Sequence, residues 1–95
     1  MAINPLKNYR ILLADPDIEL GKVLRTMLQD MGFKNIDLTS SGIEAYRMLS
    51  NAPYDFLITE WNTKQLDGIK LLKKIRRSPD SPNPVLPVIN ADGSL

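Results

Sequence analysis

The sequence contains no cysteine and no histidine among its 95 residues. Thiol catalysis, disulfide bonds, zinc sites of the usual type and an internal phosphohistidine are therefore excluded. The net charge is only +1, so no large basic field recruits nucleic acid or an anionic membrane. No apolar run approaches the roughly 20 residues that cross a bilayer, and the first eight residues lack a signal-peptide pattern. We therefore expect a cytoplasmic protein that binds neither nucleic acid nor membrane.

The length predicts a single domain over residues 1–95. Short apolar runs alternate with helical patterns along it, and the strands that they predict cover residues 9–14, 35–39, 54–59 and 85–89. Strand and helix alternate three times before the last strand. This order predicts an α/β fold in which helices cover both faces of an open parallel sheet.

Local signals mark where the helices begin and end. We predict that Asp15 caps the first helix, with Pro16 in its first turn, and that Gly32 ends it. Ser41 and Glu44 form the pattern of a capping box for the second helix. The residues predicted to face the core are Ile18, Val23, Leu24, Met27, Leu28 and Met31 in the first helix, Ile43, Tyr46 and Leu49 in the second, and Ile69, Leu71, Leu72 and Ile75 in the third.

Acidic residues follow two of the expected strands. Asp15 and Asp17 come after the first strand, and Glu60 comes directly after the third. Ligands of an open parallel sheet bind outside the carboxyl ends of the strands, where the strand order reverses. We therefore expect the three carboxylates to share one acidic pocket. The alternative is that they serve only as helix caps and turn formers.

The third helix carries a basic face. The face opposite its apolar residues carries five cations, namely Lys70, Lys73, Lys74, Arg76 and Arg77. We interpret this face as solvated, with partner binding as the alternative.

The order and spacing of these features resemble the CheY-like receiver domain of two-component response regulators, which has a flavodoxin-like fold. The resemblance covers residues 10–89 and leaves residues 90–95 as an atypical tail. It is carried by the strand before Asp15, the strand that runs into Glu60-Trp61-Asn62, the turn Leu66-Asp67-Gly68 and the strand Leu86-Pro87-Val88-Ile89. The resemblance implies a module of phosphorelay signal transduction rather than an enzyme.

In that family an Asp at the end of the third strand accepts a phosphoryl group from a kinase histidine, and an acidic pair after the first strand holds Mg²⁺. Carried over, the phosphoacceptor-equivalent residue is Glu60, and the backbone carbonyl that also binds the metal belongs to Asn62. Asp15 is the first acid of the pair, but Pro16 stands at the second position, with Asp17 after it. The implied metal ligands are thus Asp15, Glu60 and Asn62, and we expect them to bind Mg²⁺ weakly.

Glu60 is one methylene longer than the aspartate of the family. That displaces its carboxylate by about 1 Å, which can slow in-line phosphoryl transfer roughly 100-fold. We therefore expect a degenerate receiver that acts by protein-protein interaction. Two alternatives stay open: a phosphorylatable receiver that uses Mg²⁺ and the acidic pocket, and, more remotely, a fragment of a haloacid-dehalogenase-type phosphatase, which Asp15-Pro16-Asp17 also resembles.

The resemblance predicts that the chain is truncated after the fourth strand. Asp92 falls where the family has Thr or Ser, and the Lys that ends a fifth strand has no counterpart. The fourth strand would then be an open edge, and the sheet face beside the first helix would be partly uncovered. We therefore expect self-association or a covering polypeptide, in addition to a histidine kinase or another signalling protein as partner.

Overall fold

The structure is a computed structural model that describes residues 3–59 and 68–90. Within these residues the elements are η1 (Pro5–Asn8), β1 (Arg10–Ala14), α1 (Ile18–Met31), β2 (Asn35–Thr39), α2 (Gly42–Asn51), β3 (Phe56–Thr59), α3 (Gly68–Arg77) and β4 (Val88–Asn90). The alternation of strand and helix confirms the predicted α/β class.

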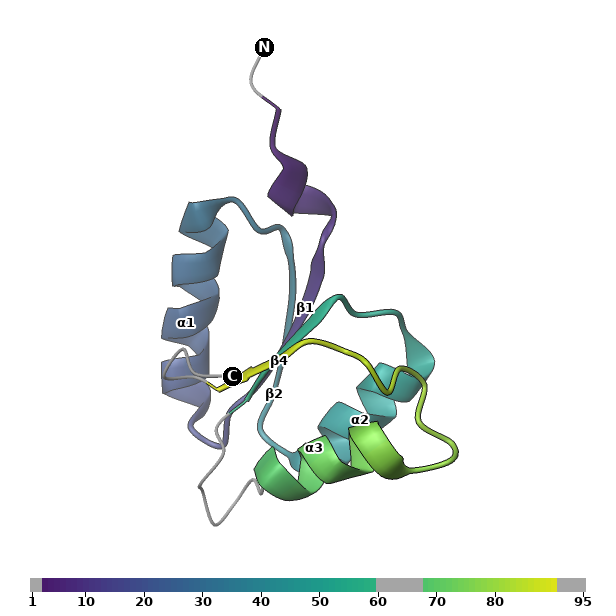
Figure 1. The fold of residues 1–95 in the computed structure, drawn as a ribbon. Helices are drawn as coiled ribbons and strands as arrows, with labels where there is room; N and C mark the ends of the chain where they lie inside the picture. The colour runs from purple at the N-terminus through teal and green to yellow at the C-terminus, as the bar shows by residue number, and fades with distance from the viewer. Residues whose placement is uncertain (1–2, 60–67, 91–95) are drawn as a thin grey trace.

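The four strands form one parallel sheet in the order β2-β1-β3-β4. Helix α1 covers one face of this sheet, and α2 and α3 lie together on the other (Figure 1). The chain moves outward from β1 to β2 and then returns to the other side of β1 to form β3. The strand order therefore reverses between β1 and β3, and the predicted open sheet with helices on both faces is confirmed.

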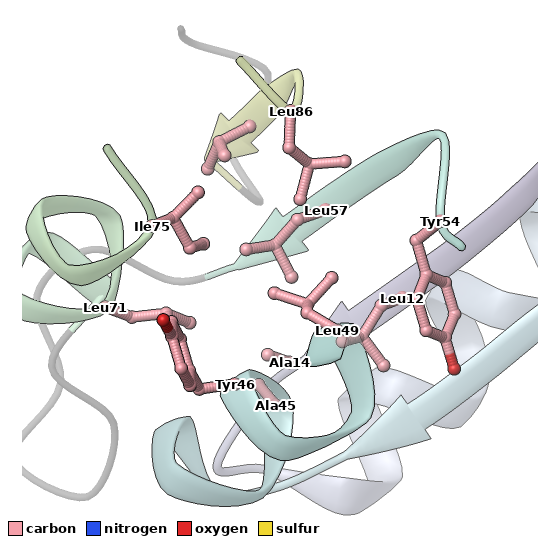
Figure 2. Close-up of a cluster of buried hydrophobic side chains, with 11 residues drawn as sticks. Leu12, Ala14, Ala45, Tyr46, Leu49, Tyr54, Leu57, Leu71, Ile75 and Leu86 are labelled. Carbon is pink, nitrogen blue, oxygen red and sulfur yellow. The ribbon is translucent and has the colours of Figure 1, made fainter. Parts of the chain in front are cut away.

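The main core lies between the sheet and the pair α2 and α3 (Figure 2). Its buried members are Leu12, Ala14, Ala45, Tyr46, Leu49, Tyr54, Leu57, Leu71, Ile75, Leu86 and Val88. Successive side chains of a strand point to opposite faces, so Leu12 points to this core while Ile11 and Leu13, which are also buried, point to the α1 face. The predicted inward positions Tyr46, Leu49, Leu71 and Ile75 are confirmed.

Two helix ends follow the local chemistry of the sequence. Ser41 is the N-cap of α2, and its Oγ accepts a hydrogen bond from the Glu44 amide at 3.3 Å. Gly32 follows α1 with a φ of 114°, a left-handed conformation that glycine adopts without a Cβ clash. Both predicted boundaries are confirmed.

The apolar stripe predicted for α1 is only partly buried. Four of its members are exposed instead: Ile18, Val23, Met27 and Met31. Leu24 and Leu28 are half-buried. The helix lies close to β2 at Gly21, its one buried residue, where an added Cβ would lie 2.5 Å from Leu38 Cδ1. The prediction was also wrong for Ile43 on α2, which is 79% exposed.

The fourth strand is shorter and later than predicted. The apolar run indicated residues 85–89, whereas β4 is Val88–Asn90. Val85 is 82% exposed. The Leu86 amide donates to the Asn83 carbonyl at 3.2 Å, so this part of the run forms a turn. Pro87 has no N–H to donate to a neighbouring strand. The Pro87 carbonyl accepts from the Leu57 amide at 2.9 Å, so hydrogen bonding to β3 begins at the proline carbonyl and not earlier in this run.

The segment between α3 and β4 is tied back to the helix. Arg76 Nη1 donates to the Pro84 carbonyl at 2.9 Å, and Ser81 Oγ donates to the Ile75 carbonyl. These two bonds anchor the connection to the end of α3.

Candidate functional site

The carboxyl ends of three neighbouring strands meet at one rim of the sheet. Ala14, the last residue of β1, pairs with Thr59 of β3, and Thr59 pairs with Asn90 of β4. The acids predicted after β1 and β3 therefore follow adjacent strand ends, on either side of the point where the strand order reverses. Such a point is where ligands of open α/β sheets bind.

Asp15 is the acidic residue that the structure places at this rim. Its amide donates to the Thr39 carbonyl at 2.9 Å, so its backbone still belongs to the sheet. Its side chain is buried, with 5% of the residue exposed. One carboxylate oxygen, Oδ1, accepts from the Asp17 amide at 2.9 Å. The other, Oδ2, is buried and has no hydrogen-bond partner within the described residues.

The prediction that Asp15 caps α1 is wrong, because Asp17 fills that position. The Asp17 side chain accepts from the Leu20 amide at 3.2 Å, and α1 begins one residue after Asp17. Asp15 cannot cap the helix because its backbone is held in the sheet and its carboxylate is turned into the rim. Asp17 is exposed, so the two acids lie in different environments.

Glu60, Asn62 and Asp92 lie outside the described residues. The phosphoacceptor-equivalent position and the carbonyl ligand therefore stay predictions, as does the residue aligned with the family's Thr or Ser.

Thr59 is a polar residue of the rim that sequence reasoning missed. Its Oγ1 is buried and, like Asp15 Oδ2, has no hydrogen-bond partner in the described part of the chain. Buried polar atoms without partners cost free energy and commonly mark a place for water or an ion. The sequence did carry a signal for it, because Thr59 places a hydroxyl directly after the apolar run Phe56-Leu57-Ile58.

The described residues fit a divalent cation in part. Mg²⁺ takes oxygen ligands and usually one or two protein carboxylates, and the unpartnered Asp15 Oδ2 suits one such ligand. Pro16 has no side-chain oxygen, and Asp17 is engaged at the start of α1. Residues 3–59 and 68–90 contain no group of three or more acidic side chains that could hold a metal. Asp15 is thus the one ligand of the predicted set that the structure describes.

The profile of the response regulator receiver domain matches residues 11–92. The chain belongs to the response regulator receiver domain family. It is therefore a CheY-like receiver of two-component signalling, and the predicted membership is confirmed. In the described part of this receiver, no helix is both long and apolar enough to cross a membrane.

Two bacterial chemotaxis proteins illustrate the sequence similarity of the receiver. Chemotaxis protein CheY-3 of Vibrio cholerae is 37% identical over 70 residues, which cover 74% of this chain and 54% of the relative. Chemotaxis protein CheY of Pseudomonas aeruginosa is 34% identical over 67 residues, which cover 70% of this chain and 54% of the relative. The chain thus spans about half the length of the curated relatives it matches.

Solved structures share the fold of the receiver. A point mutant of the receiver domain of the histidine kinase CKI1 from Arabidopsis thaliana matches with a TM-score of 0.79 at 23% identity, over 92% of this chain and 67% of that one. A sensor protein from Polaromonas sp. JS666 matches with a TM-score of 0.73 at 26% identity, over 90% of this chain and 67% of that one. These likenesses confirm the flavodoxin-like receiver fold.

Proposed function

We propose that this receiver acts by protein-protein interaction and accepts phosphate poorly. The observation that carries the proposal is the state of the acids after β1. Asp15 is the single buried carboxylate described at the rim, and one of its oxygens is already committed to the Asp17 amide. Pro16 supplies no second acid, and Asp17 is turned outward as a cap. Such a pocket holds Mg²⁺ weakly.

The remaining ligands in this proposal are the Glu60 carboxylate and the Asn62 carbonyl. When bound, Mg²⁺ would neutralise negative charge on the transferring phosphoryl group. Glu60 adds a methylene to the acceptor and displaces its oxygens by about 1 Å, enough to slow transfer roughly 100-fold. Glu60 instead holds a constant negative charge after β3.

The proposed partners are a histidine kinase or another signalling protein, met in the cytoplasm. Residues 1–95 are proposed to act as one domain. Membership in a two-component signalling family supports both statements.

Incubation with Mg²⁺ and acetyl phosphate tests the proposal. We expect the intact mass of the natural chain to stay unchanged. The double variant Glu60→Asp/Pro16→Asp is expected to gain one phosphoryl group, because it restores both the acceptor length and the second metal carboxylate. Adding Asp15→Asn to the double variant serves as the control and should abolish the gain. A phosphoryl group on the natural chain would instead favour the alternative of a phosphorylatable receiver.

We further propose that the receiver associates with itself or with a covering polypeptide. The apolar residues Val23, Met27 and Met31 recur at helical spacing on α1 and are exposed. Within the described sheet, β4 also has a neighbouring strand on one side only. Both features leave apolar or hydrogen-bonding surface in water, which proteins commonly cover.

Light scattering on the natural chain is expected to show a mass above that of a monomer at micromolar concentration. Met27→Lys should shift the mass toward the monomer, because a charge on the apolar side of α1 opposes its burial. Gln29→Lys places the same charge on another side of the helix and should leave the mass unchanged. A natural chain that stays monomeric throughout this range rules out self-association and leaves only the covering polypeptide.

A further inference from the structure

Helices α2 and α3 lie side by side (Figure 1). Residues of both helices line an open groove. The groove has a volume of about 230 Å³, and its lining combines Ile43 of α2 with Lys70 and Lys74 of α3. Pockets for whole small molecules usually measure about 300–1,000 Å³. The groove is therefore sized for one or two side chains of a partner rather than for a metabolite.

Lys74 is held in a defined position beside the groove. Its Nζ lies 4.3 Å from the centre of the Tyr46 ring, within the range of a cation–π contact. The Tyr46 hydroxyl in turn donates to Asp80 Oδ1 at 3.2 Å, which fixes the ring. A cation that is already ordered loses less conformational freedom when an anion binds to it. Lys74 is thus prepared to receive a carboxylate.

The positive charge continues along α3 beyond the groove. Lys73, Arg76 and Arg77 are exposed, and α3 contains no acidic residue. Among the described residues, Lys73 and Arg77 take part in no ion pair. Because the net charge of the whole chain is only +1, this concentration of cations is a local property of one surface.

We propose that the groove and the basic face of α3 bind an acidic segment of a partner protein. An apolar side chain of that segment lies against Ile43, which is 79% exposed, and its carboxylates pair with Lys70 and Lys74. The proposal names a surface for the interaction mode proposed above and to that extent rests on the proposed function.

The lining of the groove selects a polypeptide over a nucleic acid. Charge complementarity requires an anionic partner in either case. Binding of single-stranded nucleic acid, however, relies on bases that stack on accessible aromatic rings. The aromatic ring of this groove, Tyr46, is only 8% exposed and already faces Lys74. An exposed aliphatic side chain in the same groove as two lysines suits an acidic peptide with an apolar anchor.

The test is an NMR titration of the ¹⁵N-labelled chain of 95 residues with a synthetic peptide that carries two leucines flanked by glutamates. With peptide added up to about 1 mM, which detects even weak binding, we expect amide shifts centred on Ile43, Lys70 and Lys74. The variant Lys70→Gln/Lys74→Gln should weaken binding about tenfold, and added salt should weaken it further. Lys7→Gln/Lys34→Gln removes the same charge from exposed sites elsewhere and should leave the affinity unchanged.

Three results would overturn the docking surface. These are an absence of shifts, equal weakening in both double variants, and tighter binding of single-stranded DNA, duplex DNA or anionic vesicles than of the peptide. Circular dichroism on each variant separates lost binding from lost folding. The acetyl phosphate experiment does not involve the groove, so its outcome decides the proposed function separately.

Discussion

Replacing Asp15 with Asn is expected to raise the free energy of unfolding by about 1–3 kcal/mol. Asp15 is buried at the rim, and its Oδ2 has no hydrogen-bond partner within the described residues. A buried carboxylate with one oxygen unpaired costs more free energy than a buried neutral amide of the same shape. Asn retains the oxygen that accepts from the Asp17 amide, so the turn after β1 is preserved. Unfolding in guanidinium chloride measures the change.

Asp17→Asn is the matched control for this substitution. Asp17 is exposed and caps α1, and Asn caps helices about as well as Asp. We therefore expect little change in stability from it. Added Mg²⁺ should narrow the difference in the free energy of unfolding between the natural chain and Asp15→Asn. A cation that binds the carboxylate stabilises the natural chain but not the variant. An Asp15→Asn variant less stable than the natural chain would contradict this account and would make Asp15 a structural residue.

Raising the pH from 10 to 12 is expected to destabilise the fold through Tyr54. Burial raises the pKa of Tyr54 from 10.0 to about 12, helped by its hydrogen bond to Asp37 and by the negative charge of that carboxylate, while Arg10 opposes the shift. The Tyr54 hydroxyl donates to Asp37 Oδ2 at 2.6 Å. The Arg10 guanidinium lies 5.0 Å from the ring centre.

The sign of the pH effect follows from the raised pKa. The folded state holds the Tyr54 proton more tightly than the unfolded state, so this stabilisation is complete below pH 10 and is lost as the pH rises through 12. A shift of this size corresponds to roughly 2–3 kcal/mol. Chemical unfolding at a series of pH values measures the loss, and tyrosinate absorbance reports the ionisation.

Two tyrosine variants separate this effect from other alkaline titrations. Tyr54→Phe should flatten the fall in stability between pH 10 and 12, whereas Tyr9→Phe, at an exposed position, should retain it. An identical pH profile in the natural chain and Tyr54→Phe would assign the alkaline loss to other groups.

Helix boundaries could be predicted where one side chain decides them. Ser41 and Gly32 supply a capping oxygen and a left-handed backbone, and both act as the sequence indicated. The choice between Asp15 and Asp17 could not be made in this way. That choice depends on where β1 stops pairing with β2. The hydrogen bond from the Asp15 amide to the Thr39 carbonyl extends this pairing to Asp15, so the helix cap falls on Asp17.

Apolar periodicity predicted which helical side chains are buried only where another helix or the sheet packs against them. Leu49 on α2 and Leu71 and Ile75 on α3 are buried because the two helices share one face of the sheet. Met27 on α1 follows the same spacing and is 57% exposed. Spacing shows which side of a helix is apolar, but burial depends on the elements that lie against that side.

The position of Asp15 follows from the sequence, while the shared acidic site stays a prediction. Parallel strands all end at one rim, and Asp15 lies buried at that rim, whereas Glu60 is outside the described residues. That Asp15 Oδ2 and Thr59 Oγ1 find no partner among residues 3–59 and 68–90 could not be foreseen, since hydrogen-bond satisfaction depends on every neighbour in three dimensions.

The two hydrogen bonds that join the end of α3 to the connection before β4 have a mechanical consequence. The bond from Arg76 Nη1 reaches the Pro84 carbonyl, four residues before β4 begins, so a shift of the end of α3 is passed on to the start of β4. Leu71 and Ile75 of α3 also share one buried cluster with Leu12 and Ala14 of β1. The strand that leads to Asp15 is therefore coupled to the same helix through the core.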